Sequence, residues 1–353
     1  MDQALSIERF IRDNVADAET LWHARGGQQR IFKFGAVAIA VRFIAGHAQS
    51  IVCPVLEHLA ADGDEGMPST VVYVLVADRL DLAPPPDHWP FPEECKEDHQ
   101  RVCWRPRDGL ALSSDDARGI WHLFDLNSMT GLYWLRSDNG LPYWEAGSPL
   151  RHFIHWASVR ADQAMVHGAA IGFGGKGVLL AGAGGSGKST MTAAAISRGW
   201  QTTGDDFVLF SAPPDPVSFP IFDVMKLTGM AEGMFAEQAD KALNPARVPG
   251  EKALIPLSVN AGGKFVRSLP IQAIFSLELT GERSSRIETF SKVATVAALA
   301  PSTMNILRTA MPETLEQCSS LARNLPTYRL LVGNDPLEGL STLETFMRQH
   351  NWG

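Results

Sequence analysis

Residues 182–189 (GAGGSGKS) constrain the fold more than any other part of this sequence. They match the pattern of a phosphate-binding loop (P-loop), G-x-x-x-x-G-K-[ST], without a mismatch. The apolar run 177–181 (GVLLA) before them predicts a buried strand, and residues 190–197 (TMTAAAIS) after them predict a helix that ends near Gly199. Because this pattern binds phosphate when it joins a strand to a helix N-terminus, we predict an α/β core. The alternative is a glycine-rich turn in which the Lys-Ser pair occurs by chance.

The residue types in the loop predict binding of ATP with Mg²⁺. Glycines let several backbone N–H groups turn toward phosphate oxygens, and the positive end of the following helix attracts the same anion. Lys188 is suited to neutralise the β- and γ-phosphates, and the hydroxyl of Ser189 is suited to ligate Mg²⁺. The predicted nucleotide-binding residues of the loop are Gly182, Gly184, Gly185, Ser186, Gly187, Lys188, Ser189 and Thr190.

Two adjacent carboxylates, Asp205 and Asp206, follow after about one helix and a short turn. They precede the apolar run 207–210, whereas in most P-loop proteins the metal-linked Asp ends an apolar strand. Neighbouring residues at the start of a strand point in different directions, so one carboxylate can face the phosphates and the other the nucleophile. Near a triphosphate, one of them can accept a proton from a substrate hydroxyl. The alternative is a solvated Gly-Asp-Asp turn.

The order of these features resembles the HPr kinase/phosphorylase-like superfamily, whose fold is related to phosphoenolpyruvate carboxykinase. The shared order is His167-Gly168, a strand, the P-loop, and then Gly204-Asp205-Asp206. The chain is most similar to the HPr-kinase-related serine kinases, a branch that includes the lasso-peptide precursor kinases. Further segments like that branch are 141–145 (LPYWE), 148–151 (SPLR), 167–170 (HGAA), 223–227 (DVMKL), 250–254 (GEKAL) and 299–303 (LAPST). The resemblance covers residues 140–350 well and the preceding part more loosely.

This resemblance implies roles for individual residues. Asp205 is expected to be the catalytic base that accepts the proton of a substrate Ser hydroxyl. Asp206 is expected to be its partner near the metal, so that Ser189 and Asp206 are the expected metal ligands. His167 is expected to orient or tune the catalytic Asp, and Lys188 to act in catalysis as well as in binding. From the residues alone, a structural histidine is the favoured interpretation of His167.

Three further basic residues are candidates for contacts with phosphate. Lys226 and Lys252 match basic positions of the kinase-like branch, where they are expected to contact phosphates or stabilise transition-state charge. A solvated surface lysine remains the alternative for each. The segment 241–250 (KALNPARVPG) is predicted to be a mobile loop that closes over the nucleotide and brings Arg247 near the phosphates.

The chain departs from the family at one motif. HPr kinase/phosphorylases carry a Glu-x-Arg-Gly-type signature after the acid pair, and the corresponding residues 218–226 (SFPIFDVMK) lack its Glu and Arg. The departure argues against HPr as the substrate and against the reverse phosphorolysis. It favours another hydroxyl-bearing acceptor, such as a peptide Ser.

Composition excludes several classes of protein. The 353 residues are 45% hydrophobic and 20% charged, which suits a globular protein of about two domains. A net charge of -8 argues against a general nucleic-acid binder, which needs a basic face. Residues 1–10 show no signal-peptide pattern, and no run of 18 apolar residues occurs, so we expect a cytoplasmic protein without a membrane partner. Four scattered cysteines fit reduced thiols.

The order of predicted elements, taken with the resemblance, gives an α/β fold. It implies a P-loop kinase core of the HPr kinase/phosphoenolpyruvate carboxykinase type with an N-terminal mixed α+β domain. Residues 1–145 are the predicted N-terminal domain, where a peptide substrate would dock, and residues 146–353 the predicted catalytic domain. Strands are predicted at 31–44 (a hairpin pair), 70–77, 110–113, 131–135 and 269–278, and helices at 149–166, 229–242, 303–324 and 336–350.

We therefore expect an ATP-dependent serine kinase that phosphorylates a peptide or protein, with a lasso-peptide precursor as one candidate substrate. Two alternatives stay open, a small-molecule (metabolite) kinase on the same core and a non-catalytic regulatory ATP-binding module. Burial of Asp205 away from solvent would favour the regulatory module. Assembly into a homo-oligomer is left open.

Overall fold

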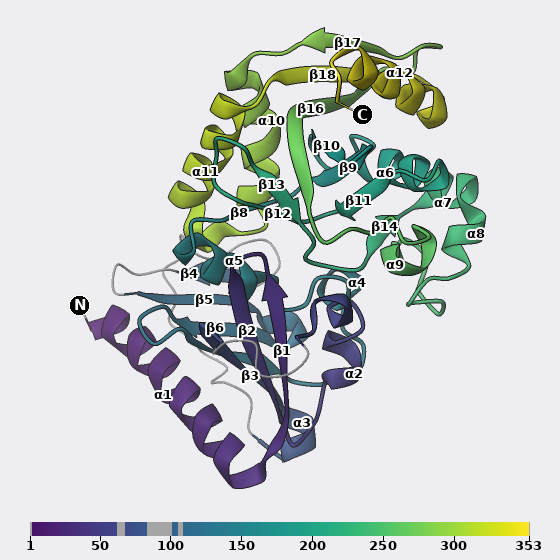
Figure 1. The fold of residues 1–353 in the computed structure, drawn as a ribbon. Coiled ribbons are helices and arrows are strands. Elements are labelled where there is room, and N and C mark those ends of the chain that lie inside the picture. Colours follow the sequence, from purple (N-terminus) through teal and green to yellow (C-terminus); the bar gives the residue numbers. More distant parts are fainter. Residues whose placement is uncertain (1, 62–67, 83–100, 105–108, 353) are drawn as a thin grey trace. The chain divides into compact units, whose positions relative to one another are not determined.

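The computed structural model describes residues 2–61, 68–82, 101–104 and 109–352. In these residues the backbone forms a mixed α/β structure with parallel and antiparallel strand pairs (Figure 1). Contacts divide it into two compact units, Met1–Ala161 with Leu307–Ala310 and Asp162–Ile306 with Met311–Gly353. The sequence placed the division at 145/146, whereas by contacts the helix Arg151–Arg160 groups with the first unit. Among helices of the described residues, none has both the length and the apolar character needed to cross a membrane.

The first unit is built on a seven-stranded sheet of order β1-β2-β3-β7-β6-β5-β4. Its strands are β1 (Gly27–Phe34), β2 (Val37–Ile44), β3 (Thr70–Val76), β4 (Arg101–Trp104), β5 (Leu110–Asp115), β6 (Ile120–Asp125) and β7 (Thr130–Leu135). Its helices are α1 (Asp2–Arg25), α2 (Gln49–Val52), α3 (Ala77–Leu80), α4 (Tyr143–Ala146) and α5 (Arg151–Arg160), with short 3₁₀ turns η1 (Glu57–Leu59), η3 (Asp116–Arg118) and η4 (Arg308–Ala310). The predicted hairpin at 31–44 is confirmed as β1–β2, and β3, β5 and β7 lie on predicted strands.

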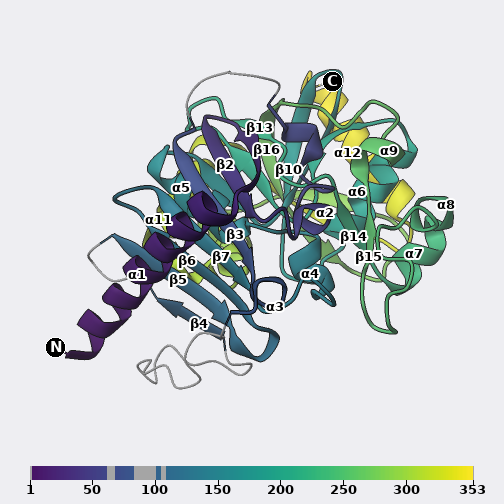
Figure 2. The same cartoon turned by 90° about the horizontal axis from the view of Figure 1, so that it is seen from below.

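Helix α1 is an element that the sequence analysis did not predict. Four apolar residues spaced three or four apart, Ile7, Ile11, Val15 and Ala18, form one buried stripe along it. The stripe packs on strands β3, β6 and β7, and the helix runs across that sheet (Figure 2). The helical periodicity of apolar residues is present in this segment, but the apolar stripe is narrow. It has about one apolar residue per turn, among many charged residues.

A buried polar network in the first unit joins α4 and α5 to the sheet. The carboxylate of Glu145, 1% exposed, accepts hydrogen bonds from Tyr133 Oη (2.7 Å) and His122 Nε2 (3.2 Å) at one oxygen. Its other oxygen accepts from Arg151 (2.5 Å). Burial would raise the pKa of Glu145, but the charge of Arg151 and the hydrogen bonds from His122 and Tyr133 hold it well below its usual value. Glu145 is therefore ionised inside the unit.

The depressed pKa of Glu145 predicts a loss of stability in acid. A carboxyl group with a folded pKa below its unfolded value of about 4.3 stabilises the fold fully above that value. Its contribution is lost as the pH falls toward the folded pKa. Wild type should therefore lose more stability than a Glu145→Gln variant between about pH 6 and pH 3, measured as urea unfolding midpoints. Equal losses in the two proteins would contradict the expectation.

The second unit contains a nine-stranded sheet, whose main path is β11-β9-β10-β16-β13-β12-β8, with β18 paired to β16 and β17 to β18. Its strands are β8 (Ala164–Val166), β9 (Ala169–Phe173), β10 (Lys176–Ala181), β11 (Gln201–Gly204), β12 (Val208–Phe210), β13 (Val217–Phe219), β16 (Leu269–Leu279), β17 (Arg286–Thr289) and β18 (Thr327–Val332). A separate two-stranded antiparallel sheet pairs β14 (Met225–Leu227) with β15 (Ala253–Ile255). Its helices are α6 (Lys188–Ser197), α7 (Gly229–Met234), α8 (Ala236–Ala239), α9 (Leu257–Asn260), α10 (Lys292–Met304), α11 (Met311–Asn324) and α12 (Pro336–Gln349).

Five strands of this sheet, β11, β10, β16, β18 and β12, run in the same direction. Strand β16 is parallel to both β10 and β18, and β9 is antiparallel to both β10 and β11, so β11, β10, β16 and β18 all point one way. Their carboxyl ends, Gly204, Ala181, Leu279 and Val332, therefore lie along one edge of the sheet. Ligands of α/β sheets bind at this kind of edge.

Helices cover both faces of the sheet, which explains the continuous apolar run of β10. Val178 and Leu180 pack with residues of α6 and α12, whereas Leu179 and Ala181 pack with residues of α10 and α11. Strands β10 and β16 and helices α6 and α12 lie on predicted elements.

Three predicted helices were wrong in extent. The helix predicted at 149–166 ends at Arg160 and is followed by β8, and the one predicted at 229–242 is two short helices, α7 and α8. The helix predicted at 303–324 is interrupted between α10 and α11, because Leu307–Ala310 belongs to the first unit.

Candidate active site

Residues 182–189, the predicted P-loop, have the strand–loop–helix setting expected from the sequence. Strand β10 ends at Ala181 and α6 begins at Lys188. Between them, Gly187 caps α6 with a φ of +96°, a conformation that favours glycine. A Cβ at Gly187 would lie 3.1 Å from Cδ2 of Leu279. The loop therefore lies directly against the carboxyl end of β16.

Lys188 folds back across the loop. Its Nζ donates to the carbonyl oxygens of Gly182 (2.8 Å) and Ala183 (3.1 Å). Burial lowers the pKa of Lys188, and the negative charges of Asp205 and Asp206 oppose that shift. The ammonium is thus held at the mouth of the loop, with protein carbonyls as its partners.

The acid pair lies between two strands, which corrects one sequence expectation. Strand β11 ends at Gly204, so the pair follows a strand as well as preceding β12. The sequence did not predict β11, because its four residues QTTG are short and polar. Thr202 and Thr203 are nevertheless fully buried. The pair thus has the usual position at the carboxyl end of a strand parallel to β10.

Asp205 is bound to the protein on both of its oxygens. It is 1% exposed, and its Oδ2 accepts hydrogen bonds from Ser189 Oγ (2.7 Å) and the backbone N–H of Lys226 (3.4 Å). Its Oδ1 accepts from Thr192 Oγ1 (3.4 Å). Burial raises the pKa of Asp205, and the hydrogen bond from Ser189 opposes the shift. Asp205 therefore orients the hydroxyl of the residue expected to ligate Mg²⁺.

Asp206 faces a cation and a histidine. Its Oδ2 lies 2.6 Å from Lys226 Nζ, and its Oδ1 lies 3.2 Å from His167 Nε2. Burial would raise the pKa of Asp206, but Lys226 and His167 hold it well below its usual value. The backbone is strained here: Asp206 has a φ of +71°, and Phe207 N–H donates to the carbonyl of Asp205 (2.9 Å) across it.

His167 is fixed at its backbone by a residue that the sequence analysis did not select. Its N–H donates to Oγ1 of Thr303 on α10 (3.0 Å), and Thr303 is fully buried. The segment 299–303 resembles the kinase-like branch, but no feature of its sequence distinguishes Thr303. Thr192 on α6 was missed in the same way.

These residues surround one cavity of about 530 Å³. Among the predicted site residues, those that line it are His167, Gly184, Gly185, Gly187, Lys188, Ser189, Thr190, Asp206, Lys226 and Lys252. Gly182, Ser186 and Asp205 are not among the residues that line it. Arg247 was expected near the phosphates, but it does not line the cavity and instead forms an ion pair with Glu232 of α7.

The cavity carries the charge that a polyanion requires. Lys188, Lys226 and Lys252 line it, and Asp206 is the one carboxylate among its lining residues. Two buried polar atoms at the site, His167 Nδ1 and Ser186 Oγ, have no hydrogen-bond partner among the described residues. Unsatisfied buried atoms of this kind are commonly satisfied by a ligand or water.

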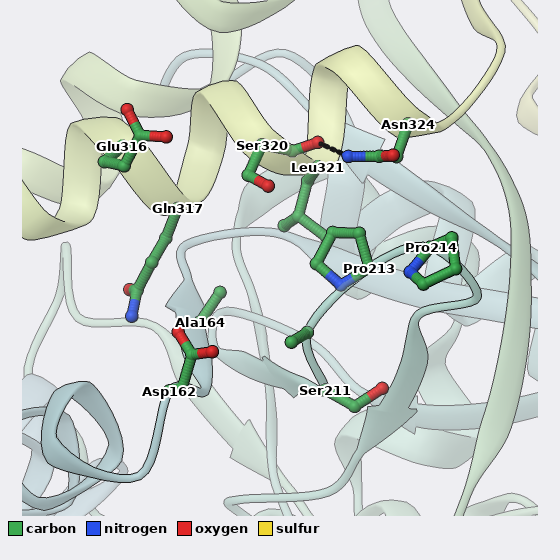
Figure 3. A pocket seen from close by; sticks show the side chains of 11 residues that line it. Asp162, Ala164, Ser211, Pro213, Pro214, Glu316, Gln317, Ser320, Leu321 and Asn324 are labelled. Carbon is green, nitrogen blue, oxygen red and sulfur yellow. Dashed lines mark hydrogen bonds between the residues drawn. The ribbon is translucent and has the colours of Figure 1, made fainter.

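A second cavity of the same unit has the opposite character. It measures about 400 Å³ and lies between the turn at residues 211–214 and α11 (Figure 3). Asp162 and Glu316 line it, and Gln317 extends from α11 toward Asp162. The residues that line it include no Lys, Arg or His. This cavity therefore does not suit a phosphate.

Comparison with known proteins adds little to this geometry. No protein-family model matches the chain, and no curated protein matches it either. One solved structure that matches is the Hpr(Ser) kinase/phosphatase from Coxiella burnetii, at 15% identity, over 53% of this chain and 95% of that one, with a TM-score of 0.30. A likeness at this TM-score carries no argument by itself, so functional assignment depends on the residues of this chain.

Proposed function

We propose that the chain is an ATP-dependent kinase that transfers the γ-phosphoryl group to a Ser hydroxyl of a peptide or protein. One observation carries the proposal: a P-loop lysine, two further lysines and a carboxylate–histidine pair line the same cavity. The lysines suit the triphosphate, and Asp206 with His167 suits the acceptor hydroxyl. The proposed core is a P-loop kinase core of the HPr kinase type.

The donor set around Ser189 fits Mg²⁺. This ion prefers oxygen ligands and is usually held by one or two protein groups together with substrate phosphates. The Ser189 hydroxyl donates its proton to Asp205, so the lone pairs of its oxygen are free for a cation. When bound, Mg²⁺ would neutralise charge on the phosphates, held by Ser189 with Asp205 or Asp206 nearby.

The geometry favours Asp206 over Asp205 as the proton acceptor, the reverse of the roles that the family resemblance implied. A general base must come within hydrogen-bond reach of the substrate hydroxyl. Asp206 lines the cavity and its side chain is 18% exposed, whereas Asp205 is buried against Ser189. We therefore assign Asp205 to orienting Ser189, and Asp206 to accepting the proton of the substrate hydroxyl.

The proposed reaction is a direct displacement. The acceptor oxygen forms a bond to the γ-phosphorus, the bond from that phosphorus to the β,γ-bridging oxygen breaks, and ADP leaves. The hydroxyl proton passes to Asp206. Lys226 pairs with Asp206 in this structure, and a shift of its ammonium toward the γ-phosphate would make that carboxylate more basic.

One observation favours a second candidate function. Burial of Asp205 was the feature expected of a regulatory ATP-binding module without transfer activity. The test is incubation with Mg²⁺ and γ-labelled ATP over a panel of peptides with terminal or internal Ser. Label on a peptide supports the kinase. ATP binding without label on any peptide would move the assignment to a metabolite kinase or to the regulatory module.

Lys188→Ala should weaken ATP binding and lower the transfer rate. The two effects together should lower kcat/KM by about 10²- to 10³-fold. The reason is that its ammonium is the cation held at the mouth of the loop. The measurement is steady-state transfer kinetics with ATP titrated by calorimetry. Lys176→Ala, which removes an exposed lysine on β10, is the matched control and should leave both quantities unchanged. A Lys188 variant with wild-type kinetics would rule out the loop as the phosphate site.

A further inference from the structure

Two sets of cavity-lining residues, here called arms, lie on opposite sides of the P-loop in the strand order. The loop follows β10, and β11, the strand before the acid pair, is two positions away on one side of β10. On the other side lie β16 and then β18. Two strand spacings amount to about 10 Å, so the arms reach in opposite directions from the loop along the sheet edge.

One arm is charged and the other is not. Asp206, which follows β11, lines the first arm together with His167 and Lys226. The second, here called the β16–β18 arm, is lined by residues at and after the carboxyl ends of β16 and β18. These are Leu279, Gly281, Val332, Gly333, Asn334 and Pro336. None of the six carries a charge.

Leu279 in this arm is unusually exposed for an apolar residue. It ends β16, packs next to Gly187, and is nevertheless 55% exposed. An apolar side chain left open to water inside a cavity, in contact distance of a phosphate-binding loop, is suited to cover a flat apolar ligand group. Asn334 supplies the hydrogen-bonding side chain of the arm, with one amide donor group and one acceptor.

We propose that the β16–β18 arm binds the nucleoside of the nucleoside triphosphate. In this arrangement Leu279 is the platform under the base, and Asn334 hydrogen-bonds to a polar edge of the nucleoside. The proposal rests on the proposed function, because it takes the ligand to be a nucleoside triphosphate. In the opposite orientation, the uncharged base would lie among the lysines and the charged phosphates would lie beside Leu279. Burying charge next to an apolar side chain is unfavourable, so the orientation with the base on Leu279 is favoured.

The proposal separates binding of the nucleoside from binding of the phosphates. Titration calorimetry with Mg²⁺ would compare ATP with inorganic tripolyphosphate, which has the phosphates and no nucleoside. Wild type should bind ATP more tightly than tripolyphosphate. Leu279→Ala should raise the Kd of ATP by about three- to tenfold, the effect of losing a half-covered leucine platform. The Kd of tripolyphosphate should stay unchanged.

Two further variants complete the test. Asn334→Ala should raise the Kd of ATP by about two- to tenfold, the usual effect of one hydrogen bond, again without changing tripolyphosphate. Leu315→Ala, at a leucine of α11 that is 43% exposed and away from the cavity, is the matched control and should change neither ligand.

The outcomes distinguish this inference from the proposed function. If wild type binds both ligands equally well, or if Leu279→Ala weakens both by the same factor, the nucleoside does not occupy this arm and the inference fails alone. The inference also fails alone if both arm variants bind ATP like wild type. If wild type binds neither ligand, the proposed function fails, and the inference fails with it.

Discussion

Asp206→Asn should lower kcat for phosphoryl transfer by about 10²- to 10⁴-fold, the range of a general acid–base group, with the Kd of ATP changed only a few-fold. The amide keeps the size and the hydrogen-bonding oxygen of the side chain but cannot accept the proton. Because Lys226 pairs with Asp206 through its ammonium, removing the negative charge also frees that ammonium for phosphate. Single-turnover transfer with labelled ATP, beside ATP titration, separates the two effects.

The comparison with Asp205→Asn decides between the two assignments of the acid pair. Asp205 orients Ser189 from a buried position, so its substitution should raise the Mg²⁺ concentration needed for half-maximal transfer more than it lowers the saturated rate. Asp215→Asn, at an exposed position of the same unit, should change neither quantity. If Asp205→Asn abolished transfer at saturating Mg²⁺ while Asp206→Asn did not, the assignment implied by the family resemblance would hold instead.

The part of the site that could be predicted from the sequence is the part encoded by neighbours in the chain. The loop with its flanking strand and helix is a local pattern, and it lies where local reasoning put it. The two adjacent carboxylates are also a local pattern, but strand β11 before them was not predicted. The partition of roles that we propose for Asp205 and Asp206 could not be predicted. It depends on the strained backbone at Asp206 and on contacts with Ser189 and Lys226, which are 16 and 20 residues away along the chain.

The same limit applies to the fold. Strands β3, β10 and β16 are long apolar runs and were predictable, whereas the four-residue β11 is polar and is defined by its pairing with β9. The interruption between α10 and α11 has its cause in tertiary structure, because Leu307–Ala310 belongs to the first unit. Periodicity within a helix carries no information about such a contact. The charged and uncharged arms of the cavity likewise follow from strand order, which local patterns do not specify.

Glu145→Ala should destabilise the first unit by about 3–5 kcal/mol at neutral pH, the cost of breaking a buried ion pair by removing one partner. The carboxylate is 1% exposed and joins three elements: Tyr133 of β7, His122 of β6 and Arg151 of α5. Without the carboxylate, the charge of Arg151 loses this buried counterion and the hydroxyl of Tyr133 loses this hydrogen-bond acceptor. Water cannot replace either partner in these buried surroundings.

Urea unfolding followed by tryptophan fluorescence would measure this loss, since all but two of the nine tryptophans precede residue 157. Glu57→Ala is the matched control, because Glu57 pairs with Arg30 at the surface of the same unit, where an ion pair is worth about 0–1 kcal/mol. Similar losses in the two variants would mean that the network around Glu145 adds no more than a surface pair. A large loss confined to Glu145→Ala would mean that the buried carboxylate is needed to compensate the charge of Arg151 between α5 and the sheet. In that case substitution of Arg151 should cost about as much, because the two side chains stabilise the fold as a pair.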